Sequence, residues 1–309
     1  MIKFTPNFFY ITLIVLLSSL FLPCYAILPR KLYLVQPEPL ILKYHNGPLL
    51  KGNLTVNLIW YGKFTPIQRS IIVDFISSLS SNVATSQPSV SSWWQIVGRY
   101  KGGPCNTVVG HQFLDENYSL GKILTSEKLV VLSNRLAHKN ALNIVLTSAD
   151  VATDDFCMNT CGAHGTSFAG KHKKTRVPYA WVGNPENQCP GQCAWPFHQP
   201  MFGPQTPPLV APNNDVGVDG MIINLATVLA GAVTNPFDSG YFQGPTAEAL
   251  EAVSACTGIF GSGSFPGYPG KVLTDPTTKA SFNAHGLHGR KYLLPAMWDP
   301  QTSSCKTLL

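Results

Sequence analysis

The sequence predicts an α+β fold in which a central, mostly mixed sheet has helices packed on it. Segments with a strand pattern and segments with a helix pattern follow one another without a strict strand–helix–strand repeat. Hydrophobic residues make up 45% of the chain and charged residues only 12%, so the chain can bury a core. No internal repeat and no linker-like break interrupts it, and residues 41–309 are expected to form a single domain.

The N-terminal residues have the pattern of a secretory signal peptide. Lys3 supplies a positive charge, residues 8–22 are apolar, and the small residues Cys24 and Ala26 stand where a signal peptidase reads. We therefore expect cleavage after Ala26, with residues 1–26 as the signal peptide and Ile27 as the mature N-terminus. Residues 27–40 are a Pro-rich lead-in without periodicity. No later segment is expected to span a membrane.

Three helices and a strand are predicted in the first half of the mature chain. Leu54–Tyr61 alternates and is rich in β-branched and aromatic residues, which predicts a strand. Thr65 then offers an N-cap, Pro66 suits the first helical position, and Gln68 completes a capping box. Apolar residues keep helical spacing from there to Ser81, and further helices are predicted over Ser89–Tyr100 and Thr125–His138.

The second half is predicted to contain two strands, a buried helix and a loop-rich end. The strands are Asn143–Ser148 and Arg176–Gly183, the latter near an edge because of Pro178. Gly220–Val233 is the most apolar segment and reads as a buried helix, with Asp219 as its cap. Short strands are expected around Lys271–Thr274, Ser281–Ala284 and Lys291–Met297.

Seven cysteines are left after removal of Cys24, and an oxidising compartment should pair most of them. An odd number predicts three disulfides and one unpaired thiol, but the connectivity does not follow from the sequence. The close spacing of the middle four, with His164 and His198 nearby, also allows a zinc site. Oxidation is the stronger hypothesis because these segments are Gly- and Pro-rich loops. The disulfide candidates are Cys105, Cys157, Cys161, Cys189, Cys193, Cys256 and Cys305.

Two sequons predict glycosylation of a secreted chain. They begin at Asn53, beside Gly52 at the start of the first strand, and at Asn117, in a polar loop. If both asparagines are glycosylated, both must lie at the surface, and we therefore expect both to be exposed.

No set of residues predicts a catalytic site. The segment from His164 to Gly170 resembles the histidine segment of subtilisin-like proteases, but the partner segments of a serine triad are absent, so we assign it to a loop held by Cys161. No Glu follows a strand beside a second acid, as a glycosidase would need, and Asp154, Asp155, Asp215 and Asp219 are more typical of caps. Catalytic, cofactor and metal residues are therefore predicted to be none.

The six tryptophans could stack on sugar rings, although a Trp in a strand or an amphipathic helix usually belongs to the core. Trp195 differs from the others because it lies in a Cys- and Pro-rich loop. It is the tryptophan that we expect to contact a ligand.

Long segments of the chain resemble the EXORDIUM/phosphate-induced protein 1 family of plants, and most of all EXORDIUM and its nearest paralogues. The resemblance covers residues 40–309 and is carried by segments that are unusual in length and composition. These are Tyr44–Leu50, Asn57–Gly62, Ala211–Phe237, Ser254–Gly267 and Arg290–Lys306.

The resemblance implies a secreted protein of the apoplast and cell wall, linked to brassinosteroid-responsive growth and cell expansion, with no established enzymatic activity. Distant relatives of the fold carry a zinc helix before a string similar to Val233–Pro236. The positions equivalent to its ligands are Thr227, Val228 and Gly231, which supply no imidazole or carboxylate. The resemblance thus implies a metalloprotease-like scaffold without the chemistry. If ligands came from elsewhere, His164, His198, Cys189 or Glu251 would be the candidates.

Three functions are compatible with the sequence. The first is a non-enzymatic signalling or wall-interaction protein that promotes growth, whose partner would be a cell-wall polysaccharide or an apoplastic receptor. The second is an extracellular hydrolase acting on wall polysaccharide or peptide. The third is a structural wall protein, which the absence of repeats disfavours. No cofactor, no nucleic-acid partner and no stable membrane insertion are expected.

Overall fold

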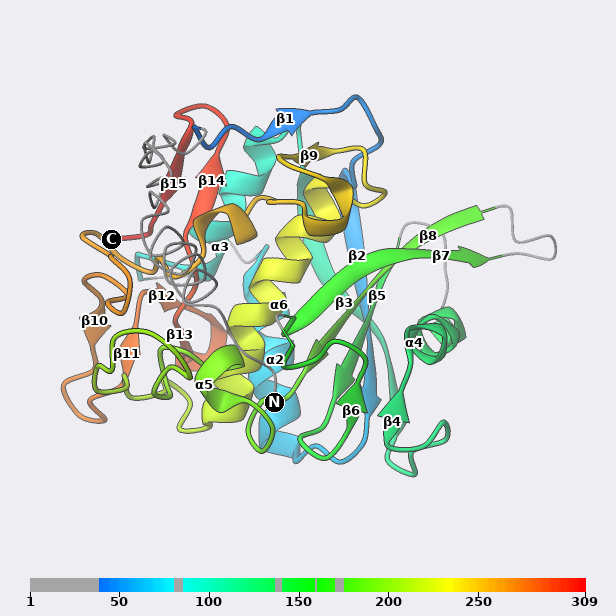
Figure 1. Ribbon diagram of the computed structural model, residues 1–309, viewed down its shortest axis with the longest axis horizontal. Helices are drawn as coiled ribbons and strands as arrows, with labels where there is room; N and C mark the ends of the chain where they lie inside the picture. Colours follow the sequence, from blue (N-terminus) through cyan, green and yellow to red (C-terminus); the bar gives the residue numbers. More distant parts are fainter. Residues whose placement is uncertain (1–38, 81–85, 137–140, 159, 170–174) are drawn as a thin grey trace, which may run out of the picture. The chain divides into compact units, whose positions relative to one another are not determined.

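A computed structural model describes residues 39–80, 86–136, 141–158, 160–169 and 175–309, and the side chains of Cys105 and Ala169 are outside this description. The expected signal peptide and almost all of the Pro-rich lead-in therefore lie outside the described residues. Leu40–Leu309 form one structural unit. Helices and strands mix in it, which confirms the α+β class (Figure 1).

A five-stranded sheet forms the centre of this unit, with strand order β3-β2-β5-β8-β7. The first four strands in this order are parallel to their neighbours, and β7 is antiparallel to β8, so the sheet is mixed. Pro178 pairs with Thr166 of the edge strand β7, one strand in from the edge, as predicted. The five strands are β2 (Gly52–Tyr61), β3 (Pro104–Asp115), β5 (Ala141–Thr147), β7 (Gly162–Ala169) and β8 (Thr175–Gly183).

Alternate residues of β2 face opposite sides of the sheet and join different cores. Leu58 and Trp60 pack in the larger core with residues of the helices α2, α3 and α6. Ile59 and Tyr61 pack in the smaller core with α4. The helices therefore cover both faces of the sheet, α4 on one and the other three on the opposite one (Figure 1). Their ranges are α2 (Pro66–Ser78), α3 (Val90–Trp94), α4 (Ser126–Ser133) and α6 (Val216–Thr234).

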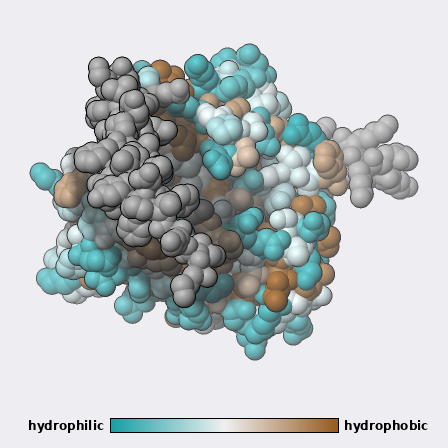
Figure 2. Space-filling view, viewed as in Figure 1, coloured by the Kyte–Doolittle hydropathy of each residue, from teal (hydrophilic) through white to brown (hydrophobic). Residues whose placement is uncertain are grey.

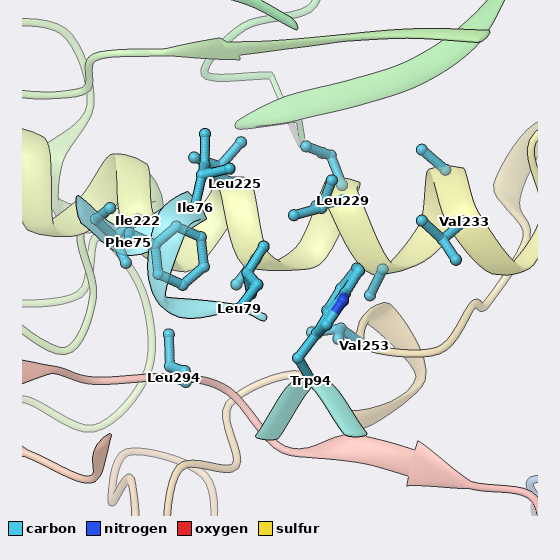
Figure 3. Close-up of a cluster of buried hydrophobic side chains, with 14 of the residues drawn as sticks. Phe75, Ile76, Leu79, Trp94, Ile222, Leu225, Leu229, Val233, Val253 and Leu294 are labelled. Carbon is cyan, nitrogen blue, oxygen red and sulfur yellow. The ribbon is translucent and has the colours of Figure 1, made fainter. Parts of the chain in front are cut away.

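The helix α6 lies at the centre of the larger core. Leu225, Leu229 and Val233 lie along it, with Leu79 of the α2 end and Trp94 of α3 facing them (Figure 3). By length and composition α6 could cross a membrane, contrary to our expectation for the mature chain, but 83% of its apolar window is buried inside the protein. This burial is what the core helix of a globular protein shows.

The predicted cap of α6 is wrong. Asp215, and not Asp219, is the N-cap, and its side chain accepts a hydrogen bond from the backbone N–H of Val218 at 2.8 Å. The helix consequently begins at Val216, four residues earlier than predicted. Asp219 is buried in the first turn and accepts hydrogen bonds from Asn213. By contrast, the predicted capping box of Thr65 and Gln68 at α2 is confirmed.

Short elements complete the unit. The predicted helix over Ser89–Tyr100 is α3 followed by the 3-10 helix η1 (Gln95–Arg99), and α4 continues into η2 (Asn134–Leu136). The remaining helices are α5 (Pro190–Cys193), η3 (Thr246–Glu248), η4 (Ser254–Cys256) and η5 (Leu287–Gly289). The remaining strands are β1 (Lys43–Tyr44), β4 (Ile123–Leu124), β6 (Ala152–Thr153), β9 (Tyr241–Phe242), β10 (Leu273–Thr274), β11 (Ser281–Phe282), β12 (Ala284–His285), β13 (Lys291–Tyr292), β14 (Met297–Asp299) and β15 (Ser304–Lys306).

Three disulfides cross-link segments of the described chain. Cys157 pairs with Cys189, Cys161 with Cys193, and Cys256 with Cys305. The first two join the same pair of segments, and the Sγ atoms of Cys189 and Cys193 are 3.6 Å apart. Cys105 is the seventh candidate.

Candidate functional site

An aromatic cleft forms where two segments meet, the second of which carries β10 and β11. One segment follows α5 and runs from residue 194 to 210, and the other runs from residue 257 to 283 (Figure 1). The Thr206 hydroxyl donates to the carbonyl of Gly267 at 2.9 Å, and the N–H of Ser281 donates to the carbonyl of Val210 at 2.8 Å. These two hydrogen bonds, which join residues 61 and 71 positions apart in the chain, fix the two segments side by side.

Glycine allows the second segment to fold back tightly on itself. Gly270 has a φ of +97°, and a Cβ atom there would lie 2.1 Å from the carbonyl oxygen of Gly261. A side chain cannot occupy that space, and an L-residue rarely adopts that φ. The turn brings Tyr268 and Lys271 to the wall of the cleft.

The cleft consists of two hollows on either side of Trp195. The first has a volume of about 560 Å³ and is lined by apolar groups that include Phe202 and Phe265. The second has a volume of about 640 Å³ and includes His198 and Lys271. Both volumes fall in the range of small-molecule sites. Trp195, the tryptophan that we expected from the sequence to contact a ligand, thus lines both hollows. Ligand contact itself stays a prediction.

The aromatic residues of the first hollow differ in exposure. Phe202 is 83% exposed and Phe265 is 63% exposed, whereas Trp195 is half-buried. The Trp195 ring packs against Phe260, with ring centroids 5.8 Å apart. Trp195 is therefore held in place by its neighbour, whereas the Phe202 and Phe265 rings are largely exposed, although Phe265 also packs against Tyr268 with ring centroids 5.1 Å apart. The other five tryptophans are buried in the core, as predicted: Trp60, Trp93, Trp94, Trp181 and Trp298.

The polar groups of the second hollow are basic or neutral. Lys271 and His198 line it, and no carboxylate is among the described residues that line either hollow. The His198 imidazole Nδ1 lies 2.9 Å from the carbonyl of Gln199. Ring stacking and hydrogen bonding to a polar or anionic ligand are the chemistry that this cleft can provide.

A second cluster, the imidazole–carboxylate pair, consists of His164 on β7 and Glu251 beside η4. The Nε2 atom of His164 lies 2.8 Å from Oε2 of Glu251, and Asn235 Nδ2 donates to the other carboxylate oxygen at 2.7 Å. The two side chains are only 10% and 15% exposed. Burial acts to lower the pKa of His164, but the hydrogen bond and charge of Glu251, with a further contribution from Asp238, raise it above its usual value. His164 lies within β7, so our assignment of this residue to a loop is wrong.

The pair occupies the space beside Gly231 of α6. A Cβ atom at Gly231 would lie 2.4 Å from Glu251 Oε2 and 2.9 Å from His164 Nε2. Thr227, one turn earlier, uses its hydroxyl to donate to the carbonyl of Ile223 at 2.9 Å, and Val228 is buried. The helix positions compared above with a zinc helix therefore carry an internal hydrogen bond, a core side chain and a glycine.

The four candidate ligands from outside the helix are not brought together. His164 and Glu251 are in contact, but His198 lines the aromatic cleft and Cys189 is in a disulfide. All four cysteines of the zinc alternative are likewise oxidised in pairs. Within the described part of the chain, no group of three or more His, Cys, Asp or Glu side chains could hold a metal.

The acidic candidates have structural contacts. Asp154 accepts a hydrogen bond from the N–H of Ser126, the first residue of α4, at 3.1 Å. Burial raises the pKa of Asp219 to about 7, although the hydrogen bonds from Asn213 oppose the shift. Asp155 lies in an exposed turn. Asp154 therefore acts as a cap and Asp155 as a turn residue, whereas Asp219 is a buried residue of α6.

Both sequons are at the surface. Asn53 is exposed at the second residue of β2, and Asn117 is exposed in the turn after β3. The hydroxyl of Ser119, the third residue of its sequon, contacts Asp115. The exposure is what an oligosaccharide needs, and glycosylation itself stays a prediction.

Comparison with known proteins identifies the family. The model of the phosphate-induced protein 1 conserved region matches residues 42–308. Protein EXORDIUM-like 2 of Arabidopsis thaliana is 64% identical over 89% of this chain and 92% of its own length. Protein PHOSPHATE-INDUCED 1 of Nicotiana tabacum is 54% identical over 93% and 94%, and Protein EXORDIUM of Arabidopsis thaliana is 54% identical over 87% and 90%. No solved structure matches the chain.

The family match spans nearly the whole described unit, including α6, the imidazole–carboxylate pair and both segments of the aromatic cleft. Its relatives support a growth-related protein of plants. The chain belongs to the EXORDIUM/phosphate-induced protein 1 family.

Proposed function

We propose that the chain is secreted and promotes brassinosteroid-dependent growth and cell expansion from the apoplast, by binding a wall component or a receptor. The observation that carries the proposal is the combination of family membership with three disulfides. Disulfides persist in oxidising compartments and are rare in the cytosol. The signal-peptide pattern of residues 1–26 provides the route.

The test compares the full chain with a matched variant lacking residues 2–26. Both are expressed in plant cells with the same C-terminal tag, and the wall fluid, the membrane fraction and the cytosol are assayed. We expect the full chain in the wall fluid with Ile27 at its N-terminus, and a growth effect for the full chain alone. An intact Met1 in the membrane fraction, or equal growth with the truncated variant, would overturn the proposal.

The absence of catalysis is part of the proposal. Its support is chemical: in a degenerate metalloprotease-like scaffold, α6 would present Thr227, Val228 and Gly231 where ligands and a base are needed. Metal analysis of the secreted protein, together with cleavage of a peptide library, tests this. Near-stoichiometric zinc that survives dialysis, with chelator-sensitive cleavage, would overturn it.

The second candidate is an extracellular hydrolase that acts on wall polysaccharide or peptide. The observation in its favour is the imidazole–carboxylate pair, because His and Glu act as general acids and bases. In that case Glu251→Gln should abolish hydrolysis of wall polymers or peptides by the secreted protein. Undiminished hydrolysis in the variant would remove the pair from consideration.

A further inference from the structure

We propose that the aromatic cleft binds an anionic glycan, a chain of uronic acid residues that stacks on the exposed aromatic rings and pairs a carboxylate with Lys271. This inference rests on the proposed function, because it names the class of wall component that the protein would recognise.

The exposed rings supply the apolar part of the recognition. Phe202 and Phe265 have most of their surface in water at the rim of the first hollow. Exposed apolar groups gathered at one hollow are typical of a binding site. Where no grey atoms cover the face shown in Figure 2, hydrophobic residues lie in small patches among hydrophilic ones. A pyranose ring has a flat face of C–H groups that fits an aromatic ring, and aromatic contacts of this kind add to the effect of area burial.

Lys271 supplies the charge. It extends from the wall of the second hollow, and no ion pair joins it to a carboxylate among the described residues. Lys291 nearby differs, because it is paired with Asp275. With no acid lining the hollows, an anionic ligand is attracted and meets no like charge. Removal of residues 1–26, which contain Lys3 and no acid, lowers the formal charge from +6 to +5, and this positive charge favours the approach of a polyanion.

Hydroxyl groups fixed by the fold provide the hydrogen-bonding part. Thr206 donates to the carbonyl of Gly267, and Thr257 donates to the carbonyl of Ser254 at 2.7 Å. Each hydroxyl has used its one hydrogen, so its oxygen can accept a hydrogen bond from a sugar hydroxyl. One such group lines each hollow.

The division of the cleft favours a chain over a single ring. The two hollows share Trp195 and Gly267, so a linear ligand that crosses Trp195 reaches both. Its rings would stack in the first hollow, and a carboxylate would reach Lys271 in the second.

The test is calorimetric titration of the secreted protein, as it is recovered from the medium, with oligogalacturonate of defined length. The matched ligand is the same oligosaccharide with its carboxylates methyl-esterified, which keeps the rings and removes the charge. We expect the free acid to bind at least fivefold more tightly, and its affinity to fall with added salt because exposed charges are screened. Equal affinity for the two forms would overturn the anionic assignment.

Two variants place the ligand in the cleft. Phe202→Ala and Lys271→Gln should each weaken binding of the free acid about three- to tenfold. Phe168→Ala on β7 and Lys63→Gln after β2, both exposed and outside the cleft, should leave the affinity unchanged. Equal effects of the cleft and control variants would show that the site is wrong.

Other outcomes separate this inference from the proposed function. A neutral β-glucan or a proline-rich peptide that binds in place of the oligogalacturonate, with loss of binding in Phe202→Ala, would refute the ligand class. If the glycan does not bind but the secreted chain still promotes growth, the inference fails and the proposed function stands. If the glycan binds and the growth effect is absent, the proposed function fails.

Discussion

Replacing Glu251 with Gln tests whether the imidazole–carboxylate pair stabilises the fold through the charge on His164. The wild-type carboxylate accepts from Asn235 Nδ2 at 2.7 Å and meets His164 Nε2 at 2.8 Å. Glutamine has nearly the same size, and its carbonyl can still accept from Asn235. Its amide nitrogen then faces the imidazole, and it can donate only to a neutral imidazole. The substitution therefore removes one charge-assisted hydrogen bond and little else.

The expected loss depends on pH. A hydrogen bond to a charged group contributes about 1.5–3 kcal/mol, and low exposure of the pair limits screening. The folded-state pKa of His164 is raised by Glu251, despite the opposing effect of burial. The stabilisation is thus fully present below the unfolded-state pKa of about 6.5, and it is lost as the pH rises through the folded-state pKa. We expect Glu251→Gln to lower the free energy of unfolding by about 2 kcal/mol at pH 5 and by less than 1 kcal/mol at pH 9.

Guanidinium unfolding of the disulfide-intact protein at several pH values measures this difference. The control is His288→Gln, since His288 pairs with Asp74 but its side chain is 75% exposed. Exposed pairs contribute about 0–1 kcal/mol, so this control should change little at any pH. The reasoning is refuted if Glu251→Gln costs the same at pH 5 as at pH 9.

Three further predictions concern packing, covalent links and modification. Gly231→Ala should destabilise the fold by about 1–3 kcal/mol, because the added Cβ atom would clash with the imidazole–carboxylate pair. At Gly98 an added Cβ atom would meet no neighbour, so Gly98→Ala should not destabilise the fold. Thermal melts of the two variants test this difference. Replacing Cys256 and Cys305 together by Ser opens a link across a separation of 49 residues and should cost about 4 kcal/mol in denaturant unfolding, and a cost near zero would contradict the chain-entropy argument. Asn117→Gln should remove one oligosaccharide mass from the secreted protein without lowering its stability, and an unchanged mass would show that the sequon is unused.

Local patterns were enough for the elements that bury an apolar face. β2, β5 and β8 carry apolar or alternating residues, and α6 is apolar along its length, so their positions follow from the sequence. The capping box of Thr65 and Gln68 fixed the start of α2 for the same reason: every group involved lies within four residues.

The two edge strands could not be predicted in this way. β3 contains Gly110, whose missing side chain makes room for the amide of Asn57, and the register with β2 shifts nearby. β7 contains Gly162 and Gly165 and pairs along its length with β8. Edge strands bury less, so small and polar residues are tolerated, and the pairing partner decides the structure.

The candidate sites show the same limit. Trp195 stood out because of its loop, but Phe202, Phe265 and Lys271 did not, since exposure and the meeting of two loops are properties of the folded chain. His164 and Glu251 are 87 residues apart, and the sequence indicated them only as two of four candidate ligands, without showing that these two side chains meet. Asp219 was taken for a cap because the sequence does not show which of two nearby aspartates faces the core.

Residues near the C-terminus pack against the first helices, α2 and α3, and these contacts limit when the chain can fold during synthesis. Trp93 of α3 donates its indole N–H to the carbonyl of Pro295 at 2.8 Å, and Tyr292 donates to the carbonyl of Ile71 in α2 at 3.0 Å. Arg99 pairs with the buried Asp299, and β1 pairs with β9 some two hundred residues later. These contacts cannot form until the ribosome has released almost the whole chain. The first hundred residues would therefore leave the ribosome with apolar surface still uncovered, and we expect the nascent chain to fold slowly and to be prone to aggregate until its last residues emerge.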